Sequence, residues 1–314
     1  MRFLLTLVFL SLSLPVFSQE IEVKNLEKHV YYLASDKMKG RGTGSKENQK
    51  AADYIVKHFK KYNLQPMGTD GYFQNFEAKV KKVKVPDSIR AARNVIAFLD
   101  NQAEKTIVIG AHYDHLGEGK QGSSLAKDSY GIIHNGADDN ASGVAGLLEL
   151  ARYYSQNKIK EPVNFLFIAF GAEELGLVGS RYFVKNPTYD LSKVLWMLNM
   201  DMIGRLNKET GVSIIGYGTS PAFETIFNGI NRDSFVKFYT NYEGRGGSDQ
   251  TSFYEKDIPV LFFHTNGHPD YHTPTDDAEK VDYESLKGIL NLEKAVIDAS
   301  SNLKDMPFNN TDKK

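Results

Sequence analysis

Side chains of the kinds that bind transition metals follow several apolar segments of this chain. His112 follows IVIGA, Asp201 follows LWMLNM, and His272 lies shortly after IPVLFFH. The adjacent glutamates Glu173 and Glu174 follow FLFIAFGA. We expect these apolar segments to be strands, and sites in open α/β sheets form at the carboxyl ends of the strands. The sequence therefore predicts that these side chains converge.

Two further carboxylates, Asp138 and Asp139, lie in NGADDNASG, just before a segment with helical spacing. An aspartate in this position is often only a helix cap. A single histidine or glutamate is likewise more often a packed or surface residue than a ligand. Spacing alone does not choose between Asp138 and Asp139. A shared site is favoured because all of these residue types coincide at strand ends.

Two histidines and three carboxylates without sulfur suit two zinc ions that share one carboxylate. Such ions, about 3.5–4 Å apart, can hold a water molecule, polarise a carbonyl and stabilise an oxyanion. Another carboxylate must then move the proton of that water to a leaving amine. The pair Glu173 and Glu174 could supply one ligand and one base. Asp114, two residues after His112, could accept a hydrogen bond from the imidazole nitrogen that does not bind metal.

The composition excludes several other classes of site. The 314 residues include 38 basic and 39 acidic side chains, so no net field favours nucleic acid or an anionic membrane. The chain has no cysteine, which excludes thiol nucleophiles, thiolate zinc ligands and a lipid anchor on an N-terminal cysteine. We therefore expect no nucleic-acid partner and no membrane anchor.

The N-terminus has the pattern of a signal peptide. Arg2 precedes the apolar segment 3–14, which is too short to span a membrane, and Pro15 ends that segment. We expect cleavage after Ser18, so that residues 1–18 are removed. The rest of the chain would then be exported, to the periplasm or the medium.

Apolar segments of strand length alternate with helical patterns along most of the chain. This order predicts one α/β domain over residues 19–314, a three-layer sandwich around a mixed, mainly parallel twisted sheet. We expect N-terminal helices and an edge strand over 19–92, a metal-binding core over 93–304, and a flexible tail over 305–314. The lysine-rich alternation KVKKVKV within 73–85 is interpreted as the edge strand, since lysines commonly protect sheet edges.

Five motifs resemble those of metallopeptidase family 28, the secreted di-zinc aminopeptidases. They occur in the family's order as AHYDHLG, NGADDNASG, GAEELGLVGS, NMDMIG and DYHTPTD, across most of the chain after Arg93. The N-terminal segment LASDKMKGRGTGS is also similar to members of that family. The resemblance implies the zinc aminopeptidase fold (phosphorylase/hydrolase-like) and two zinc ions per chain. It also implies hydrolysis of the N-terminal residue from peptides with a free N-terminus.

The resemblance further implies which residues bind metal. One zinc ion would be bound by His112 and Asp201, and the other by Glu174 and His272. Asp139, the aspartate followed by Asn-Ala-Ser-Gly, would bridge the two ions. Other divalent transition metals could occupy the same nitrogen and oxygen ligands.

The remaining roles also follow from the resemblance. Glu173 would be the general acid and base, and Asp114 would orient a ligand. Tyr271 could donate to the oxyanion, although it could equally be an aromatic ring packed beside His272. The loop GRGGSDQTSF resembles a family segment near the substrate pocket, with Ser248 and Asp249 as its candidate residues. Four other histidines are expected to be loop or supporting residues: His115, His134, His264 and His268.

Three alternatives stay open at this stage. Glutaminyl cyclases share the fold and most of these ligands but use one zinc ion, and they tend to have tryptophan before the last histidine, where this chain has Tyr271. A metal-free, receptor-like binding module is disfavoured because no expected ligand is missing. A di-zinc amidase or deacylase that acts on small acyl amino acids would use the same chemistry. Neither the preferred N-terminal residue, nor the substrate length, nor the oligomeric state follows from the sequence.

Overall fold

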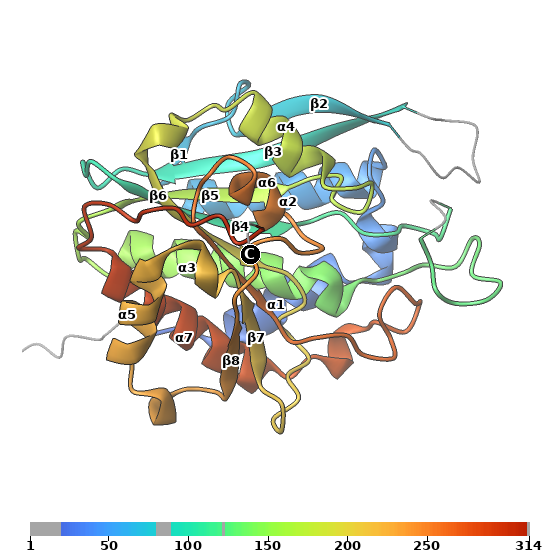
Figure 1. Ribbon diagram of the computed structural model, residues 1–314. Helices are drawn as coiled ribbons and strands as arrows, with labels where there is room; N and C mark the ends of the chain where they lie inside the picture. Colours follow the sequence, from blue (N-terminus) through green and yellow to red (C-terminus); the bar gives the residue numbers. More distant parts are fainter. Residues whose placement is uncertain (1–19, 80–88, 121–122, 313–314) are drawn as a thin grey trace, which may run out of the picture.

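The computed structural model describes residues 20–79, 89–120 and 123–312. The predicted signal peptide, residues 1–18, and most of the KVKKVKV segment lie outside the described residues. Within the described ranges, nine strands form one mixed sheet, in the order β1-β3-β5-β4-β6-β9-β7-β8, and β2 pairs with β3. Figure 1 shows this sheet through the middle of the molecule, with helices on either side.

The strands and helices have the following bounds. The strands are β1 Gln65–Pro66, β2 Phe73–Lys79, β3 Ile89–Leu99, β4 Thr106–His112, β5 Asn164–Phe170, β6 Val194–Met200, β7 Val212–Ile215, β8 Phe238–Asn241 and β9 Val260–His264. The helices are α1 Val23–Leu33, α2 Lys46–Lys61, α3 Gly143–Gln156, α4 Val178–Lys185, α5 Pro221–Gly229, α6 Gln250–Tyr254 and α7 Tyr283–Ser300.

Alternating side chains of the central strands build two separate apolar layers. In β5, Phe165 and Phe167 pack into the larger layer with α1, α2, α3, α5 and α7. Leu166 and Ile168 of the same strand point the other way and pack with α4 and α6. Because both faces are covered, the strand is apolar at every position after Asn164. The expected three-layer α/β sandwich is confirmed.

The strands at the centre of the sheet run parallel to one another. β4 pairs in parallel with β5 and β6, and β6 pairs in parallel with β9. Four strand pairs are parallel and four are antiparallel, and three of the antiparallel pairs join β1, β2, β3 and β5 at one edge. The carboxyl ends of β4, β5, β6 and β9 therefore share one side of the sheet.

The C-terminal segment differs from the prediction of a flexible tail over residues 305–314. In its described part, the amide of Asn309 donates to the carbonyl of Thr219 at 2.8 Å, and the amide of Thr311 donates to the Tyr254 hydroxyl at 2.9 Å. Thr311 is buried, and the ring of Phe308 lies 5.4 Å from that of Tyr254. Residues 308–311 therefore bond to and pack against the core in the structure, where we expected a flexible tail.

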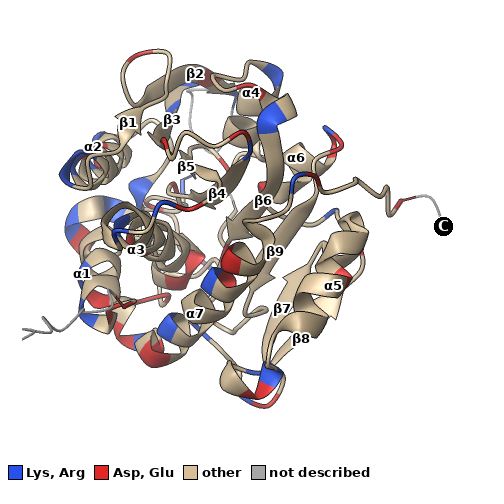
Figure 2. Ribbon diagram, turned by 90° about the vertical axis from the view of Figure 1, so that its left-hand side faces the viewer, with Lys and Arg blue, Asp and Glu red and all other residues tan. Residues whose placement is uncertain are grey.

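Charged residues of both signs are spread over the outer helices, as Figure 2 shows for α1 and α7. Within the described ranges, no helix has the length and apolar character needed to cross a membrane.

Candidate metal centre

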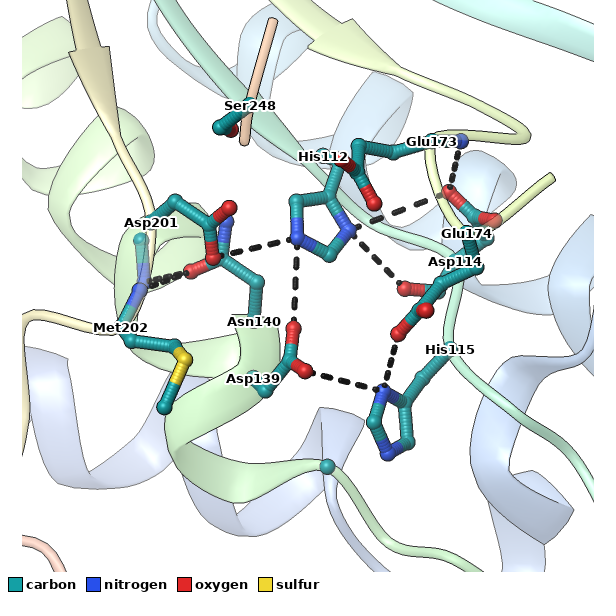
Figure 3. A network of polar contacts seen from close by, with 12 residues as sticks. His112, Asp114, His115, Asp139, Asn140, Glu173, Glu174, Asp201, Met202 and Ser248 are labelled. Atoms are coloured by element: carbon teal, nitrogen blue, oxygen red, sulfur yellow. Dashed lines mark hydrogen bonds and ion pairs between the residues drawn. The ribbon is translucent and has the colours of Figure 1, made fainter. Parts of the chain in front are cut away.

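Three of the predicted ligands lie at or shortly after the ends of parallel strands. His112 is the last residue of β4, Asp201 directly follows β6, and Glu174 lies in the turn after β5. Asp139 lies in the tight turn Ala137–Ser142 that leads into α3, and its peptide bond to the next residue is cis. In the structure these four side chains lie close together at the carboxyl ends of the strands, as Figure 3 shows.

One group of side chains surrounds the first oxygen of Asp139. The Nε2 atom of His112 lies 3.3 Å from Asp139 Oδ1 and 3.2 Å from Asp201 Oδ1. All three side chains are buried or nearly so, and their ligand atoms lie within 4.8 Å of one another. These three residues form a compact nitrogen and oxygen donor set.

A second group surrounds the other oxygen of Asp139. The Nε2 atom of His272 lies 3.2 Å from Asp139 Oδ2 and 3.2 Å from Glu174 Oε2. The two carboxylate oxygens of Asp139 therefore face different histidines. That is the arrangement expected of a carboxylate that bridges two ions.

The main chain fixes the orientation of both imidazoles. The Nδ1 atom of His112 donates to the carbonyl of Asp114 at 3.2 Å, and that of His272 donates to the carbonyl of Ser123 at 3.1 Å. A carbonyl oxygen only accepts, so Nδ1 carries a hydrogen, and Nε2 is the nitrogen that can bind a metal once its own proton is lost. Histidines that bind metals commonly have this arrangement.

The separations also fit zinc. Zinc binds histidine nitrogen and carboxylate oxygen at about 2.0–2.2 Å, so two ligands on a tetrahedral ion lie about 3.3 Å apart. The distances from each Nε2 atom to its two carboxylate oxygens, 3.2–3.3 Å, match that value. Buried carboxylates at this density need cations, and charges in protein interiors are typically paired or bind metals.

The electrostatics of the second group are those of ionised carboxylates around a cation. Burial lowers the pKa of His272, but hydrogen bonds to Asp139 and Glu174 outweigh it and raise that pKa to about 11. Burial and Asp139 raise the pKa of Glu174, but hydrogen bonds to His115 and His272 hold it at about 2. Positive charge at this position is therefore strongly favoured.

The structure distinguishes Asp138 from Asp139, between which the sequence spacing did not choose. The carboxylate of Asp138 points away from the histidines of both groups: Oδ1 accepts from the amide of Gly204 at 2.6 Å, and Oδ2 lies 3.1 Å from Nε2 of His268. The amides of Asp138 and Asp139 both donate to Asp276, at 3.0–3.1 Å. Asp276 therefore helps to hold this turn, a role that we did not predict from the sequence.

Asn140 and Gly143 connect the turn to the end of β6. The side-chain oxygen of Asn140 accepts from the amide of Gly143 at 2.9 Å, as an N-cap does, and its nitrogen donates to the carbonyl of Met200 at 2.9 Å. A Cβ at position 143 would lie 2.5 Å from that same carbonyl. Glycine is therefore required where the helix and the strand approach each other.

Asp114 makes a different contact from the one that we expected. Its carboxylate lies 3.9 Å from His112 Nδ1, which bonds to the main-chain carbonyl instead. Asp114 Oδ1 accepts from the amide of Glu173 at 3.0 Å, and Oδ2 accepts from the hydroxyl of Thr43 at 2.9 Å. The carboxylate thus holds the backbone that carries Glu173.

Glu173 lies at the rim of the candidate ligands and lines the adjoining cavity. Burial raises the pKa of Glu173 well above its ordinary value, with His112 opposing and Glu174 adding to the rise. A carboxyl group with a raised pKa can carry a proton near neutral pH.

His115 lies closer to the candidate ligands than we expected. Its Nδ1 atom lies 2.8 Å from Glu174 Oε1 and 3.8 Å from Asp139 Oδ2, and it belongs to a group that could hold a metal ion. Its Nε2 atom is buried and has no hydrogen-bond partner among the described residues. The second histidine of the HYDH motif is the sequence signal for this position.

Arg41, from the GRG turn, lies buried behind the site. Its guanidinium donates to the main-chain carbonyls of Leu33, Tyr113, Asn135 and Gly136, at 2.6–3.0 Å. Burial lowers the pKa of Arg41 to about 10, against the opposing charges of Asp139 and Asp276. Arg41 is therefore charged at neutral pH, and it joins the two loops that carry His112 and Asp139.

A cavity of about 360 Å³ opens beside the candidate ligands. Its wall includes the apolar side chains of Met202, Ile215 and Phe262. Tyr271 also lines the cavity, and its ring stacks on the imidazole of His272 with 3.9 Å between the ring centres. Tyr271 is therefore packed against His272 and also forms part of the cavity wall.

The GRGGSDQTSF loop contributes Gly247 and Ser248 to the cavity wall and Asp249 to the interior. Ser248 lines the cavity, and its hydroxyl accepts from the side chain of Asn199 at 2.8 Å. Asp249 is fully buried, and burial raises its pKa to about 7. Of the supporting histidines, His134 bonds to Ser124 and not to a candidate ligand.

Residues 94–297 of the chain match the sequence model of the family described as "Peptidase family M28". The chain belongs to peptidase family M28. Its match includes every candidate ligand, from His112 to His272. The resemblance that the motifs indicated is therefore confirmed, and the chain is a member of a family of metallopeptidases.

Curated relatives carry peptidase names. The chain is 37% identical over 126 residues to Leupeptin-inactivating enzyme 1 of Streptomyces exfoliatus. This alignment covers 40% of this chain and 28% of that enzyme. It is 30% identical over 173 residues to Aminopeptidase YwaD of Bacillus subtilis, which covers 52% of this chain and 37% of that protein. The chain thus spans about a third of the length of these two relatives.

The fold is also that of a glutaminyl cyclase. A crystal structure of the Bacteroides thetaiotaomicron glutaminyl cyclase bound to N-acetylhistamine aligns with a TM-score of 0.70 at 19% identity, covering 91% of this chain and 100% of that one. Similarity at this identity establishes the fold alone.

Proposed function

We propose that this chain is an exported aminopeptidase that binds two zinc ions and hydrolyses the N-terminal residue from peptides. The observation that carries this proposal is the position of Asp139 between two histidines. Nε2 of His112 faces one of its oxygens at 3.3 Å, and Nε2 of His272 faces the other at 3.2 Å. Each oxygen thus has its own nitrogen donor and its own second carboxylate.

The proposed ligand sets follow from this division. One ion would be bound by His112 and Asp201, the other by Glu174 and His272, with Asp139 shared. When bound, the two zinc ions would lower the pKa of a water molecule and polarise the carbonyl of the substrate. The nitrogen and oxygen donors would also accept other divalent transition metals, so zinc is proposed from the donor set and the ligand separations.

Glu173 is the proposed general acid and base. Its raised pKa allows it to hold the proton taken from water and to deliver it to the leaving amine. Asp114, which accepts from the Glu173 amide, is the proposed positioning residue for this carboxylate.

Tyr271 is the proposed donor to the oxyanion. Tyr271 lines the cavity. Burial, and next the negative charges of Asp139 and Glu174, raise the pKa of Tyr271 above its ordinary value. The hydroxyl therefore keeps its proton at neutral pH and can donate to a developing negative charge.

The cavity supports removal of a single N-terminal residue. Its volume of about 360 Å³ exceeds that of one side chain, and it is lined on one side by candidate ligands and on another by Met202, Ile215 and Phe262. A substrate amide at the proposed metal ions would leave its N-terminal side chain within this apolar wall.

A single-zinc glutaminyl cyclase is the second candidate, because it shares the fold at a TM-score of 0.70. The nitrogen donor on each oxygen of Asp139 favours two ions over one. Purified protein loaded with zinc should release amine from aminoacyl amides and leave N-acetylated analogues intact. Cyclisation of a glutaminyl substrate without amide hydrolysis would instead support the cyclase.

Export is proposed from the N-terminal pattern of residues 1–18. The mature protein recovered from the periplasm or the medium should then begin at Gln19, which N-terminal sequencing would determine. A protein that keeps Met1 in the cytoplasm would exclude it.

A further inference from the structure

A histidine that is not a proposed metal ligand lies beside the apolar residues of the cavity wall. Met202, Ile215 and Phe262 line it together with His264, the last residue of β9. The imidazole of His264 lies 5.4 Å from the ring of Phe262, centre to centre, and is half-buried. This histidine is not among the proposed metal ligands or the proposed proton carriers.

The orientation of this imidazole is fixed by the main chain. Nδ1 of His264 lies 2.8 Å from the carbonyl oxygen of Asp201. Since a carbonyl oxygen only accepts, Nδ1 carries the hydrogen, and Nε2 of the neutral ring is an acceptor. The bond also limits rotation of the ring, so the acceptor has one direction.

In the part of the chain that the structure describes, Nε2 of His264 has no protein partner. The atom is also not fully buried. His264 is one of the residues that line the cavity. The acceptor is therefore open to whatever side chain enters the cavity.

We propose that His264 Nε2 accepts a hydrogen bond from the side chain of the substrate's N-terminal residue. The enzyme would then favour a residue that carries a donor, such as threonine, asparagine or tyrosine, more than the apolar wall alone allows. This inference rests on the proposed function and names the substrate class of that same site.

The expected effect is a relative one. An apolar wall favours leucine over asparagine because the amide loses its contacts with water on entering the cavity. A single neutral hydrogen bond offsets part of this cost and is worth about fivefold in an equilibrium. The contribution of His264 is therefore measured as a ratio of kcat/KM values for two substrates of similar shape. Replacement of His264 should change this ratio.

The experiment uses three pairs of aminoacyl amides that differ mainly in a donor: valyl and threonyl, leucyl and asparaginyl, phenylalanyl and tyrosyl. kcat/KM is measured for each with the zinc-loaded full chain and with His264→Phe, which keeps an aromatic ring without the acceptor. The ratio of kcat/KM for the donor-bearing substrate to that for the apolar substrate should fall about fivefold in at least one pair. Division within a pair cancels general damage to the metal centre.

Two further variants complete the design. Phe262→Leu changes the apolar wall of the same cavity and should change both members of a pair alike. His264→Gln retains a donor and an acceptor and should keep the ratio within about threefold. If His264→Phe is insoluble, the same ratio is measured in His264→Leu.

The outcomes separate this inference from the proposed function. Ratios that stay within about twofold in every pair, in an enzyme that still hydrolyses the amides, would overturn the role of His264 alone. An equal loss for all six substrates would also overturn it, since His264 would then act on a part common to every substrate. Failure of the unaltered enzyme on all six would count against the proposed function itself.

Discussion

The main-chain amide of Glu173 donates a hydrogen bond of 3.0 Å to the carboxylate of Asp114. The other oxygen of this carboxylate accepts from Thr43 at 2.9 Å, so both oxygens are used as acceptors. Asparagine in place of Asp114 would present an NH2 group to one of these two donors. We therefore expect Asp114→Asn to lower kcat/KM by about 10–100-fold, measured with an aminoacyl amide.

A matched control for Asp114→Asn is Thr43→Val. This change removes one hydrogen bond to Asp114 and leaves the contact with Glu173 intact, so its loss of activity should be several-fold smaller. Equal losses in the two variants would mean that Asp114 acts through the Thr43 contact and not through Glu173.

Arg41 should be required for stability because four main-chain carbonyls depend on it. Arg41→Met removes these hydrogen bonds and leaves buried acceptors without partners, each at about 1–3 kcal/mol. We expect the free energy of unfolding to fall by more than about 3 kcal/mol in chemical denaturation. The exposed Arg181 provides the control, since Arg181→Met should change that free energy by less than about 0.5 kcal/mol. Similar values for both variants would contradict the role of Arg41.

Acid should destabilise the fold through a buried histidine between α1 and α2. Nδ1 of His29 lies 2.7 Å from the Tyr54 hydroxyl, and the ring lies 4.6 Å from that of His58. Burial, followed by the charge of His58, lowers the pKa of His29 from 6.5 to about 3. The unfolded chain therefore binds more protons below pH 6.5, so stability is complete above that pH and declines from pH 6.5 towards pH 3.

The candidate ligands also titrate in acid, so the contribution of His29 is measured as the difference between the unaltered protein and a His29 variant. Replacement by phenylalanine removes the titrating group and keeps an aromatic ring. The slope of unfolding free energy against pH between 6 and 4 should decrease by about 1.4 kcal/mol per pH unit relative to the unaltered protein. Parallel slopes would show that His29 titrates normally in the folded state.

The strands and the convergence of the site could be predicted because buried parallel strands are apolar at every position. NFLFIAF is buried on both faces in β5, and the next polar residues, Glu173 and Glu174, must then emerge at its end. The short strands β1 and β8, of two and four residues, carry no such pattern and were not predicted. Too few side chains alternate in them to give a period.

Contacts that depend on side-chain direction were less accessible from the sequence. Spacing put Asp114 two residues from His112, but the imidazole turns to the carbonyl and not to the carboxylate. The four carbonyls that Arg41 contacts lie 8–95 residues away in the chain, in segments that only the fold brings together. The flexible tail was predicted from polar composition, which does not report that Thr311 finds a buried partner.

The central claim is a pair of metal ions served by Glu173 as a separate proton carrier, and metal content tests it most directly. Zinc per chain is measured after dialysis for the mature protein and for Glu173→Gln, together with hydrolysis of an aminoacyl amide. We expect close to two zinc ions per chain in both proteins, and a loss of at least about 100-fold in kcat for the variant alone. About one zinc ion per chain, or a variant that loses metal together with activity, would contradict the account.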